Sequence, residues 1–468
     1  MSGLIALEFN EVSRDVLERL VAKGRLPNFA RLLKSHALLP TTVSESYEKL
    51  EPWIQWVTAH TGKTQAEHGA FNLSDVQHTK LEQIWDVLER RGVPCGLVSP
   101  MNARRGALTK GFFIPDPWTT SKDTYPPEAD SIFQFLAEKV QSHNVSLERG
   151  SSKLGFALAC LRLGVPLPAM VRLGAAYVRT RLDRKNKWKL PAELDRFLFS
   201  MMLALRAKYR TQYTSIFMNS VAHYQHHYWN VHDAGYWSKR FPALFKLRNP
   251  VAETNLHEGD DPIDYGMKVM DEVLGRAIDA VGTESVMVLT GLSQLPFEGY
   301  RGGTGFYLYR PIDHAALFGA LGIEIDRIAP LMSRDAMLYF ADEAQKATAL
   351  RKLRTATVRG EPLFLCTDET EQRLFVKVIY SFDAQQEATI DGEDVVPGSI
   401  KFHDHLLLIT FKTGHHSPEG MLIAPRSAVP ALPAGESLPL QEVPAIIFRA
   451  MRLEDSERLA RELVLSPA

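Results

Sequence analysis

The chain has 468 residues, 45% of them hydrophobic and 23% charged, which is the composition of a globular protein with a large buried core. A formal net charge of −1 gives no support to nucleic-acid binding or to a polybasic membrane anchor. Three widely spaced cysteines, Cys95, Cys160 and Cys366, exclude a disulfide framework and a paired-cysteine zinc site. The N-terminus has no signal-peptide pattern and no segment is uniformly apolar enough to span a bilayer, so we expect a cytoplasmic protein without a transmembrane segment.

A short apolar run, Leu4–Phe9, predicts a buried strand of a parallel sheet. Residues 15–33 follow with apolar side chains at helical spacing, and this order of strand, polar turn and helix indicates an α/β fold. Ligands bind at the carboxyl ends of strands in such folds, so Asn10 and Glu11 stand where chemistry is usually placed. The alternative makes Asn10 a turn residue and Glu11 a helix-start acid.

A helix is predicted from Pro52, because proline fits the first helical turn. Glu51 then caps the helix, where the dipole favours a carboxylate and where an active-site acid would meet a metal or an anion. Trp56 faces the core at this spacing. A later strand over residues 96–99 ends in a turn containing Asn102, which we assign to substrate binding.

Residues 153–189 mix apolar and basic side chains, and Pro166 and Pro168 interrupt them. The pattern predicts a helical insertion that is too broken and too charged to cross a bilayer. The insertion forms a cap over the site, an interfacial face or a simple packed subdomain.

The densest group of histidines follows a predicted strand, Tyr213–Met218. If the chain turns helical at Asn219, then Asn219 and His223 lie four residues apart on one helical face, and His226 continues that face one turn later. Such a pair after a strand can direct two ligands at one metal ion. The competing interpretation is that the rings pack and bond to the backbone.

The next predicted strand, residues 285–289, ends in the small and polar segment 290–294. The glycine-rich segment 299–305 has neither the lysine of a phosphate-binding loop nor the spacing of a dinucleotide-binding one. Arg301 within it is a candidate contact for an anionic substrate.

Mixed short strands and a helix over residues 323–399 predict a small α+β insertion. The strand 406–411 is expected to resume the core and to deliver His416 in the segment 414–420.

Four segments in this order resemble the alkaline phosphatase superfamily, in particular its type I phosphodiesterase and nucleotide pyrophosphatase branch. They are Gly24-Arg25-Leu26-Pro27-Asn28 after the first strand, Trp56 to Gly62 with His68-Gly69, Asn219 with His223, and Gly414-x-His416 with Gly420. The resemblance covers residues 4–120, 210–310 and 400–425 and implies a two-metal hydrolase fold.

This chain departs from the family at its metal ligands. The resemblance implies two ions, usually zinc, and a nucleophilic threonine or serine. Here Asn10 and Asn219 stand at aspartate positions, the segment 290–293 lacks an aspartate–histidine pair, and Glu51 stands at the nucleophile position. An amide binds a divalent cation less well than a carboxylate, so we expect at most one ion. Its expected ligands are Asn219, His223 and His416, with His226 or His415 as an alternative further ligand and Asn10 as a remnant of the other site.

We therefore expect a doubly wound, mostly parallel α/β core over residues 1–149, 201–322 and 400–468, with insertions at 150–200 and 323–399. The expected function is metal-dependent hydrolysis of a small phosphate or related ester. The residues assigned to it are, as catalytic acids and bases, Glu51 and Glu11; as ligands of one divalent ion, zinc by preference, Asn10, Asn219, His223 and His416; and as substrate contacts, Asn102, Arg301 and His226. The alternative is a catalytically inactive relative that binds a ligand or acts as a scaffold.

Overall fold

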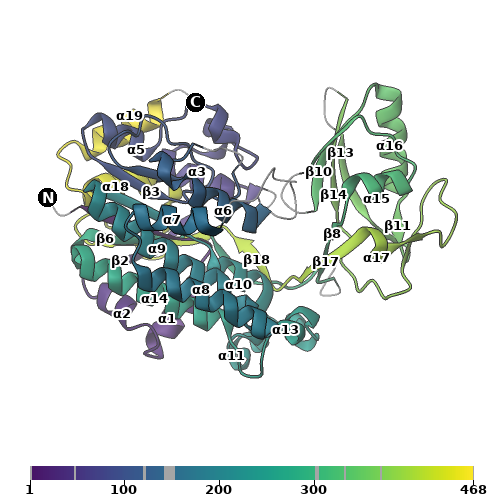
Figure 1. Cartoon of the computed structure of the whole chain (residues 1–468), viewed down its shortest axis with the longest axis horizontal. Helices are drawn as coiled ribbons and strands as arrows, with labels where there is room; N and C mark the ends of the chain where they lie inside the picture. The colour runs from purple at the N-terminus through teal and green to yellow at the C-terminus, as the bar shows by residue number, and fades with distance from the viewer. Residues whose placement is uncertain are drawn as a thin grey trace.

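The computed structural model describes residues 3–46, 49–119, 123–141, 153–300, 305–330, 334–368 and 372–466. It has a large lobe built on one sheet and a small lobe built on another (Figure 1). The main sheet has eight strands in the order β20 (Leu438–Pro439), β2 (His36–Thr42), β19 (Glu419–Pro425), β6 (Val286–Leu289), β1 (Leu4–Phe9), β5 (Tyr213–Met218), β3 (Cys95–Val98) and β4 (Phe112–Ile114). All neighbouring pairs run parallel except the two that β19 makes, with β2 and with β6. The predicted fold class, a doubly wound and mostly parallel sheet, is confirmed.

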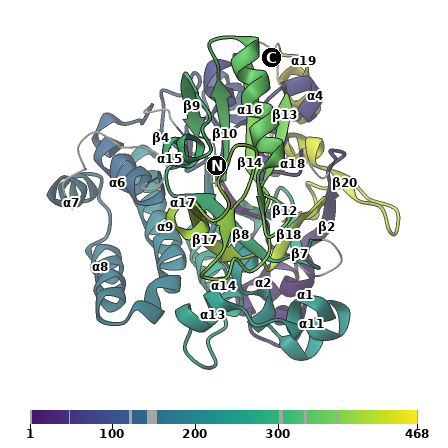
Figure 2. The same ribbon diagram turned by 90° about the vertical axis from the view of Figure 1, so that its right-hand side faces the viewer.

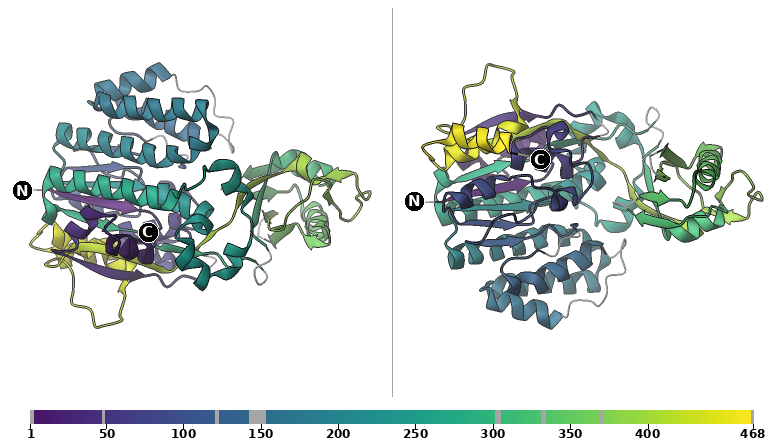
Figure 3. Two further views of the ribbon diagram at one scale, coloured as in Figure 1. Left: turned by 90° about the horizontal axis from the view of Figure 1, so that it is seen from below. Right: turned by 90° about the horizontal axis from the view of Figure 1, so that it is seen from above.

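Side chains alternate across this sheet between two hydrophobic layers. In β1, Ile5, Leu7 and Phe9 face one layer, whereas Leu4 and Ala6 face the other. The first layer is covered by α1 (Arg14–Ala22), α2 (Pro27–Leu32), α9 (Leu190–Tyr209), α10 (Ser220–Tyr228) and α14 (Pro262–Val281). The second is covered by α3 (Pro52–Thr61), α5 (Ile84–Arg90), α18 (Val443–Ala450) and α19 (Ser456–Leu465). Figure 3 shows the sheet between these two layers of helices.

The small lobe has its own apolar cluster, built from residues between Tyr309 and Leu406. Its four-stranded antiparallel sheet has the order β13 (Phe364–Asp368), β14 (Arg373–Val378), β10 (Asp335–Tyr339) and β9 (Arg327–Pro330), with α15 (His314–Ala320) and α16 (Glu343–Thr355) beside it. The acidic composition of residues 368–371 predicts the turn of a hairpin between β13 and β14, and residues 369–371 lie outside the described residues. The domain bounds given above stay a prediction.

One strand lies elsewhere than expected. Leu406–Phe411 (β17) does not join the main sheet but pairs antiparallel with β8 (Tyr307–Pro311) in a ribbon of the small lobe. The strand that enters the main sheet is β19, which follows β18 (Gly414–Ser417). The sequence pattern could not separate these strands because both are short apolar runs. The ribbon of β18 and β7 (Ser293–Pro296) adjoins the β8–β17 ribbon, so two paired stretches of chain join the lobes.

The described cysteines are all free, and no helix among the described residues is long and apolar enough to cross a membrane.

A buried histidine makes the stability of the large lobe depend on pH. His68 ends α4 (Gln65–His68) and is 2% exposed; its Nδ1 accepts from Ala70 N at 3.1 Å and its Nε2 lies 3.2 Å from Thr58 Oγ1. Because Nδ1 accepts, the ring is neutral and carries its proton on Nε2. Burial lowers the pKa of His68 to about 4.

We expect this group to destabilise the folded chain in acid. The unfolded chain binds the proton first as the pH falls below about 6.5, so stability is lost between there and pH 4. At pH 4.5 the loss from this histidine should reach about 2–3 kcal/mol relative to pH 7. Urea denaturation of the wild type and of His68→Asn, which keeps an acceptor for Ala70, measures it. Identical pH slopes in the two proteins would contradict the assignment.

Candidate functional site

The polar residues after the central strands meet at one edge of the main sheet. Asn10 N donates to Met218 O at 3.0 Å and Glu11 N to Thr290 O at 3.2 Å, so the ends of β1, β5 and β6 lie side by side. Because β19 runs against these strands, its first residues lie at the same edge. The preceding strand β18 therefore delivers His416 to the carboxyl ends of the parallel strands.

Glu11 is the centre of this group. It is 2% exposed and its backbone is in the left-handed region with φ of 57°, a conformation that costs energy for a side-chain-bearing residue. Its Oε2 lies 3.2 Å from His226 Nε2 and 3.2 Å from His416 Nε2. Gln294 Nε2 donates to the same oxygen. One ligand atom from each of Glu11, His226 and His416 lies within 4.8 Å of the others, which is close enough for all three to hold one metal ion.

The three side chains fit a zinc ion by their chemistry. Two imidazole nitrogens and one carboxylate oxygen form the ligand set of many catalytic zinc sites, which keep a fourth position for water or substrate. His416 Nε2 is buried, and although it lies 3.2 Å from Glu11 Oε2, the two atoms are not aligned for a hydrogen bond. That nitrogen is therefore available as a ligand.

Charges within the group reinforce one another. Burial raises the pKa of Glu11, but His416 and His226 lower it more, and the result lies well below the usual range. Burial lowers the pKa of His416, but Glu11 and Glu51 outweigh it and raise the value. Glu11 is therefore ionised at neutral pH, and without a metal ion His416 is the group that takes up a compensating proton.

Glu51 stands beside His416 as a second carboxylate. It occupies the N-cap of α3, as predicted, and its Oε2 lies 3.7 Å from His416 Nδ1. Its side chain is 30% exposed, so it can meet both the histidine and water. Asn102 fixes the start of α3, because its Nδ2 donates to Trp53 O at 2.9 Å and to Asn72 O at 3.2 Å. The amide nitrogen of this predicted substrate contact is thus used within the protein, whereas its buried Oδ1 has no hydrogen-bond partner among the described residues.

The two asparagines at aspartate positions bond to each other. Asn10 Nδ2 donates to Asn219 Oδ1 at 2.8 Å and to Glu11 Oε1 at 2.9 Å, while Asn10 Oδ1 accepts from Trp56 Nε1 at 2.8 Å. The indole can only donate and the carboxylate can only accept, so these neighbours fix the orientation of the Asn10 amide. Both amide oxygens are occupied by protein donors, and Asn10 orients Glu11.

His223 lies outside the group that could hold a metal. Its ring packs 4.4 Å from that of His227, four residues on, whose Nδ1 lies 2.6 Å from Thr410 Oγ1. Burial lowers the pKa of His223 to about 4. His226 lies about 60° around the helix from His223, and this rotation carries its ring to Glu11 instead. The structure thus brings His416 and His226 together but not His416 and His223.

A cationic pair lines the site where the lobes join. Lys412 Nζ lies 4.7 Å above the ring of Phe297 and 3.4 Å from Tyr300 Oη, and Arg334 also bonds to that phenol. Burial lowers the pKa of Lys412. Burial raises the pKa of Tyr300, but Lys412 and Arg334 lower it below its usual value. Among the described residues, neither cation is paired with a carboxylate, so this side of the site favours an anion.

Several of these residues could not be found from the sequence. Gln294 faces His416 across the β7–β18 ribbon, a pairing that no local pattern reveals. Lys412 lies between the predicted strand 406–411 and the segment 414–420, and no sequence pattern assigned it a role. Arg301, a predicted substrate contact, lies outside the described residues.

No protein-family model matches the sequence, and no curated protein matches it. Among solved structures, the chain is similar to a phosphonoacetate hydrolase from Sinorhizobium meliloti 1021 in complex with phosphonoformate, with 14% identity, a TM-score of 0.44, and 96% of this chain and 95% of that one covered. It is also similar to the wild-type alkaline phosphatase PafA, with 12% identity, a TM-score of 0.45, and 96% of each chain covered. Alkaline phosphatases are the superfamily that the sequence motifs resemble.

Proposed function

We propose that the chain hydrolyses a small phosphate or related anionic ester with one divalent ion, zinc by preference, bound to Glu11, His226 and His416. The observation that carries this proposal is the convergence of one carboxylate and two imidazoles from three distant segments within 4.8 Å. In this proposal Glu11 and His226 are ligands in place of Asn219 and His223. Asn10 and Asn219 hold the Glu11 carboxylate in position.

A divalent ion bound there would polarise an ester oxygen and stabilise negative charge in the transition state. Glu51 is the general base, because its carboxylate reaches solvent and lies beside the site. Contact with Glu51 also orients the His416 ring, in the manner of a carboxylate behind a zinc-bound histidine. Lys412 and Arg334 attract the negatively charged substrate and select against neutral esters.

One observation favours a second function, a non-catalytic protein that binds an anion. Glu11 already accepts from Gln294 and lies beside His416, whose pKa is raised, so an imidazolium can balance the buried charge in place of a metal ion. The Lys412 pair would then bind the anion without hydrolysis. A cytoplasmic location remains an expectation under both proposals.

Metal content and turnover separate the two functions. After extensive dialysis, elemental analysis should find one zinc ion per chain. A panel of phosphate monoesters, phosphodiesters and phosphonates should include one substrate whose hydrolysis stops when a chelator is added and returns when zinc is restored. His226→Ala should lose both the ion and the turnover. His257→Ala is the matched control, because that histidine is half exposed and pairs with Asp183.

A chain without metal that binds phosphate but hydrolyses no ester would establish the second function. Two ions per chain would contradict both, since no second group of three such ligands exists among the described residues.

A further inference from the structure

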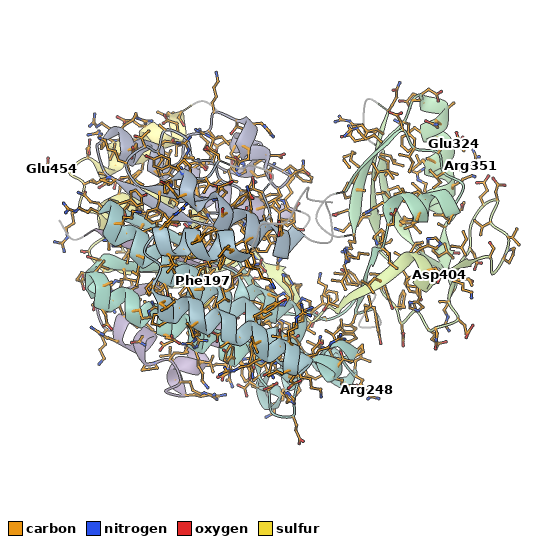
Figure 4. The ribbon with its side chains drawn as sticks, in the orientation of Figure 1. Phe197, Arg248, Glu324, Arg351, Asp404 and Glu454 are labelled. Carbon is orange, nitrogen blue, oxygen red and sulfur yellow. The ribbon has the colours of Figure 1, made fainter. Side chains whose placement is uncertain are left out.

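A helical hairpin forms the outermost layer of the large lobe. Helix α7 (Lys153–Arg162) and helix α8 (Leu167–Leu182) lie outside α9, as Figures 1 and 2 both show. Phe156 of α7 packs on Phe197 of α9, with ring centroids 5.6 Å apart, and Phe197 is 1% exposed within the lobe (Figure 4). The inner face of the hairpin is therefore anchored in the core.

The outer face of the hairpin is apolar. On α7 the exposed side chains follow one helical stripe: Leu154 is 69% exposed, Leu158 44% and Leu161 55%. On α8 the exposed residues Leu167, Val171, Val178 and Leu182 likewise share one helical stripe, and they are 61%, 62%, 55% and 82% exposed. An ordinary surface helix places polar residues on this face, and a large exposed apolar patch marks an interaction site.

Basic side chains surround the stripe. Residues 153–189 contain nine lysines and arginines and a single acidic residue, Asp183, in a chain whose net charge is −1. At 100° per residue, Arg179 and Arg181 fall on the two edges of the α8 stripe. Among the described residues, only Arg172 of these nine cations is paired with a carboxylate, that of Glu193 and of Glu272.

We propose that the α7–α8 hairpin docks on the surface of a membrane that contains anionic phospholipids. The apolar stripe enters the boundary between headgroups and acyl chains, and the unpaired arginines and lysines bind lipid phosphates. A second copy of the chain is a poor occupant, because a symmetric contact would place two such basic surfaces against each other. The inference stands apart from the chemistry of the metal-binding group.

Flotation of the full chain with lipid vesicles tests the proposal. The wild type should float with phosphatidylcholine vesicles containing phosphatidylglycerol, and should remain in solution with phosphatidylcholine alone. Binding should weaken as salt is raised, since screening reduces the attraction. Arg179→Glu with Arg181→Glu should lower the partition coefficient roughly tenfold or more, and Val171→Ser with Val178→Ser should have a similar effect.

The matched control is Val396→Ser with Lys401→Glu, two exposed residues of the small lobe, and it should float like the wild type. The proposal would be overturned if the wild type bound neutral and anionic vesicles equally, or if it did not bind anionic vesicles. Either result would hold regardless of how the variants behave. A wild-type dimer that Val171→Ser with Val178→Ser converts to monomers would show that a second copy covers the stripe instead. Thermal melting of each variant checks that it folds.

Discussion

His416→Ala is expected to remove the divalent ion from the chain, whereas His223→Ala should leave it bound. His416 supplies one of the three ligand atoms that converge among the described residues, and changes even in residues that merely orient a ligand lower metal affinity by about 10–100-fold. The loss of the ligand itself should therefore exceed about 100-fold and abolish turnover with it. Competition with a fluorescent zinc chelator measures the affinity.

His223→Ala serves as the comparison because the sequence assigned both histidines to the metal, whereas only His416 lies against Glu11 and the His223 ring packs on His227. His223→Ala should lower the free energy of unfolding by about 1 kcal/mol, because it removes only the packing of this ring against His227. Loss of the ion in both variants would support the ligands assigned from the sequence, which include His223 and His416. Retention of the ion in His416→Ala would refute the grouping around Glu11.

Trp56→Ala is expected to lower the free energy of unfolding by about 3–5 kcal/mol. The indole is fully buried and meets the ring of Phe217 edge-on at 5.5 Å, so truncation leaves a cavity in the second hydrophobic layer. It also removes the donor to Asn10 Oδ1. Urea denaturation at pH 7 gives the difference.

Trp56→Phe separates packing from hydrogen bonding at this position. It keeps an aromatic ring, smaller than the indole, and removes the donor, so it should cost about 1–3 kcal/mol, the range for an orphaned buried acceptor. If Trp56→Phe cost as much as Trp56→Ala, the Asn10 contact rather than the cavity would dominate. If it cost nothing, the amide of Asn10 would have turned to another donor.

The sequence predicted those elements whose local residue pattern directly favours one secondary structure. Leu4–Phe9 is apolar except for Glu8, and Tyr213–Met218 is rich in β-branched and aromatic residues; both form strands with the predicted bounds. Pro52 starts a helix and Glu51 caps it because the ring of proline suits the first turn. The strand 406–411 was misplaced because its partner, β8, is about 100 residues away and no local pattern encodes it.

For the candidate site, the sequence predicted which strand ends meet but not which side chains face one another there. Parallel topology brings Asn10 and Asn219 to one edge, as expected from their positions after strands. His416 reaches the same edge by another route, on β18 ahead of the antiparallel strand β19. Which histidine faces Glu11 depends on the rotation of α10, and a shift of three residues turns the ring by about 60°. The left-handed backbone at Glu11, which directs its carboxylate inward, has no signature in the sequence.

The position of β19 also bears on how the chain is made. In the main sheet, β19 lies between β2 and β6, and its register places Glu419 opposite Thr42. The slot beside β2 therefore stays empty until the ribosome has added nearly all of the chain. At the usual 5–20 residues per second, this interval lasts roughly 20–75 s. During that time β2 has no partner on this side in the nascent chain, and an unpaired strand edge of this kind is a site where growing polypeptides aggregate.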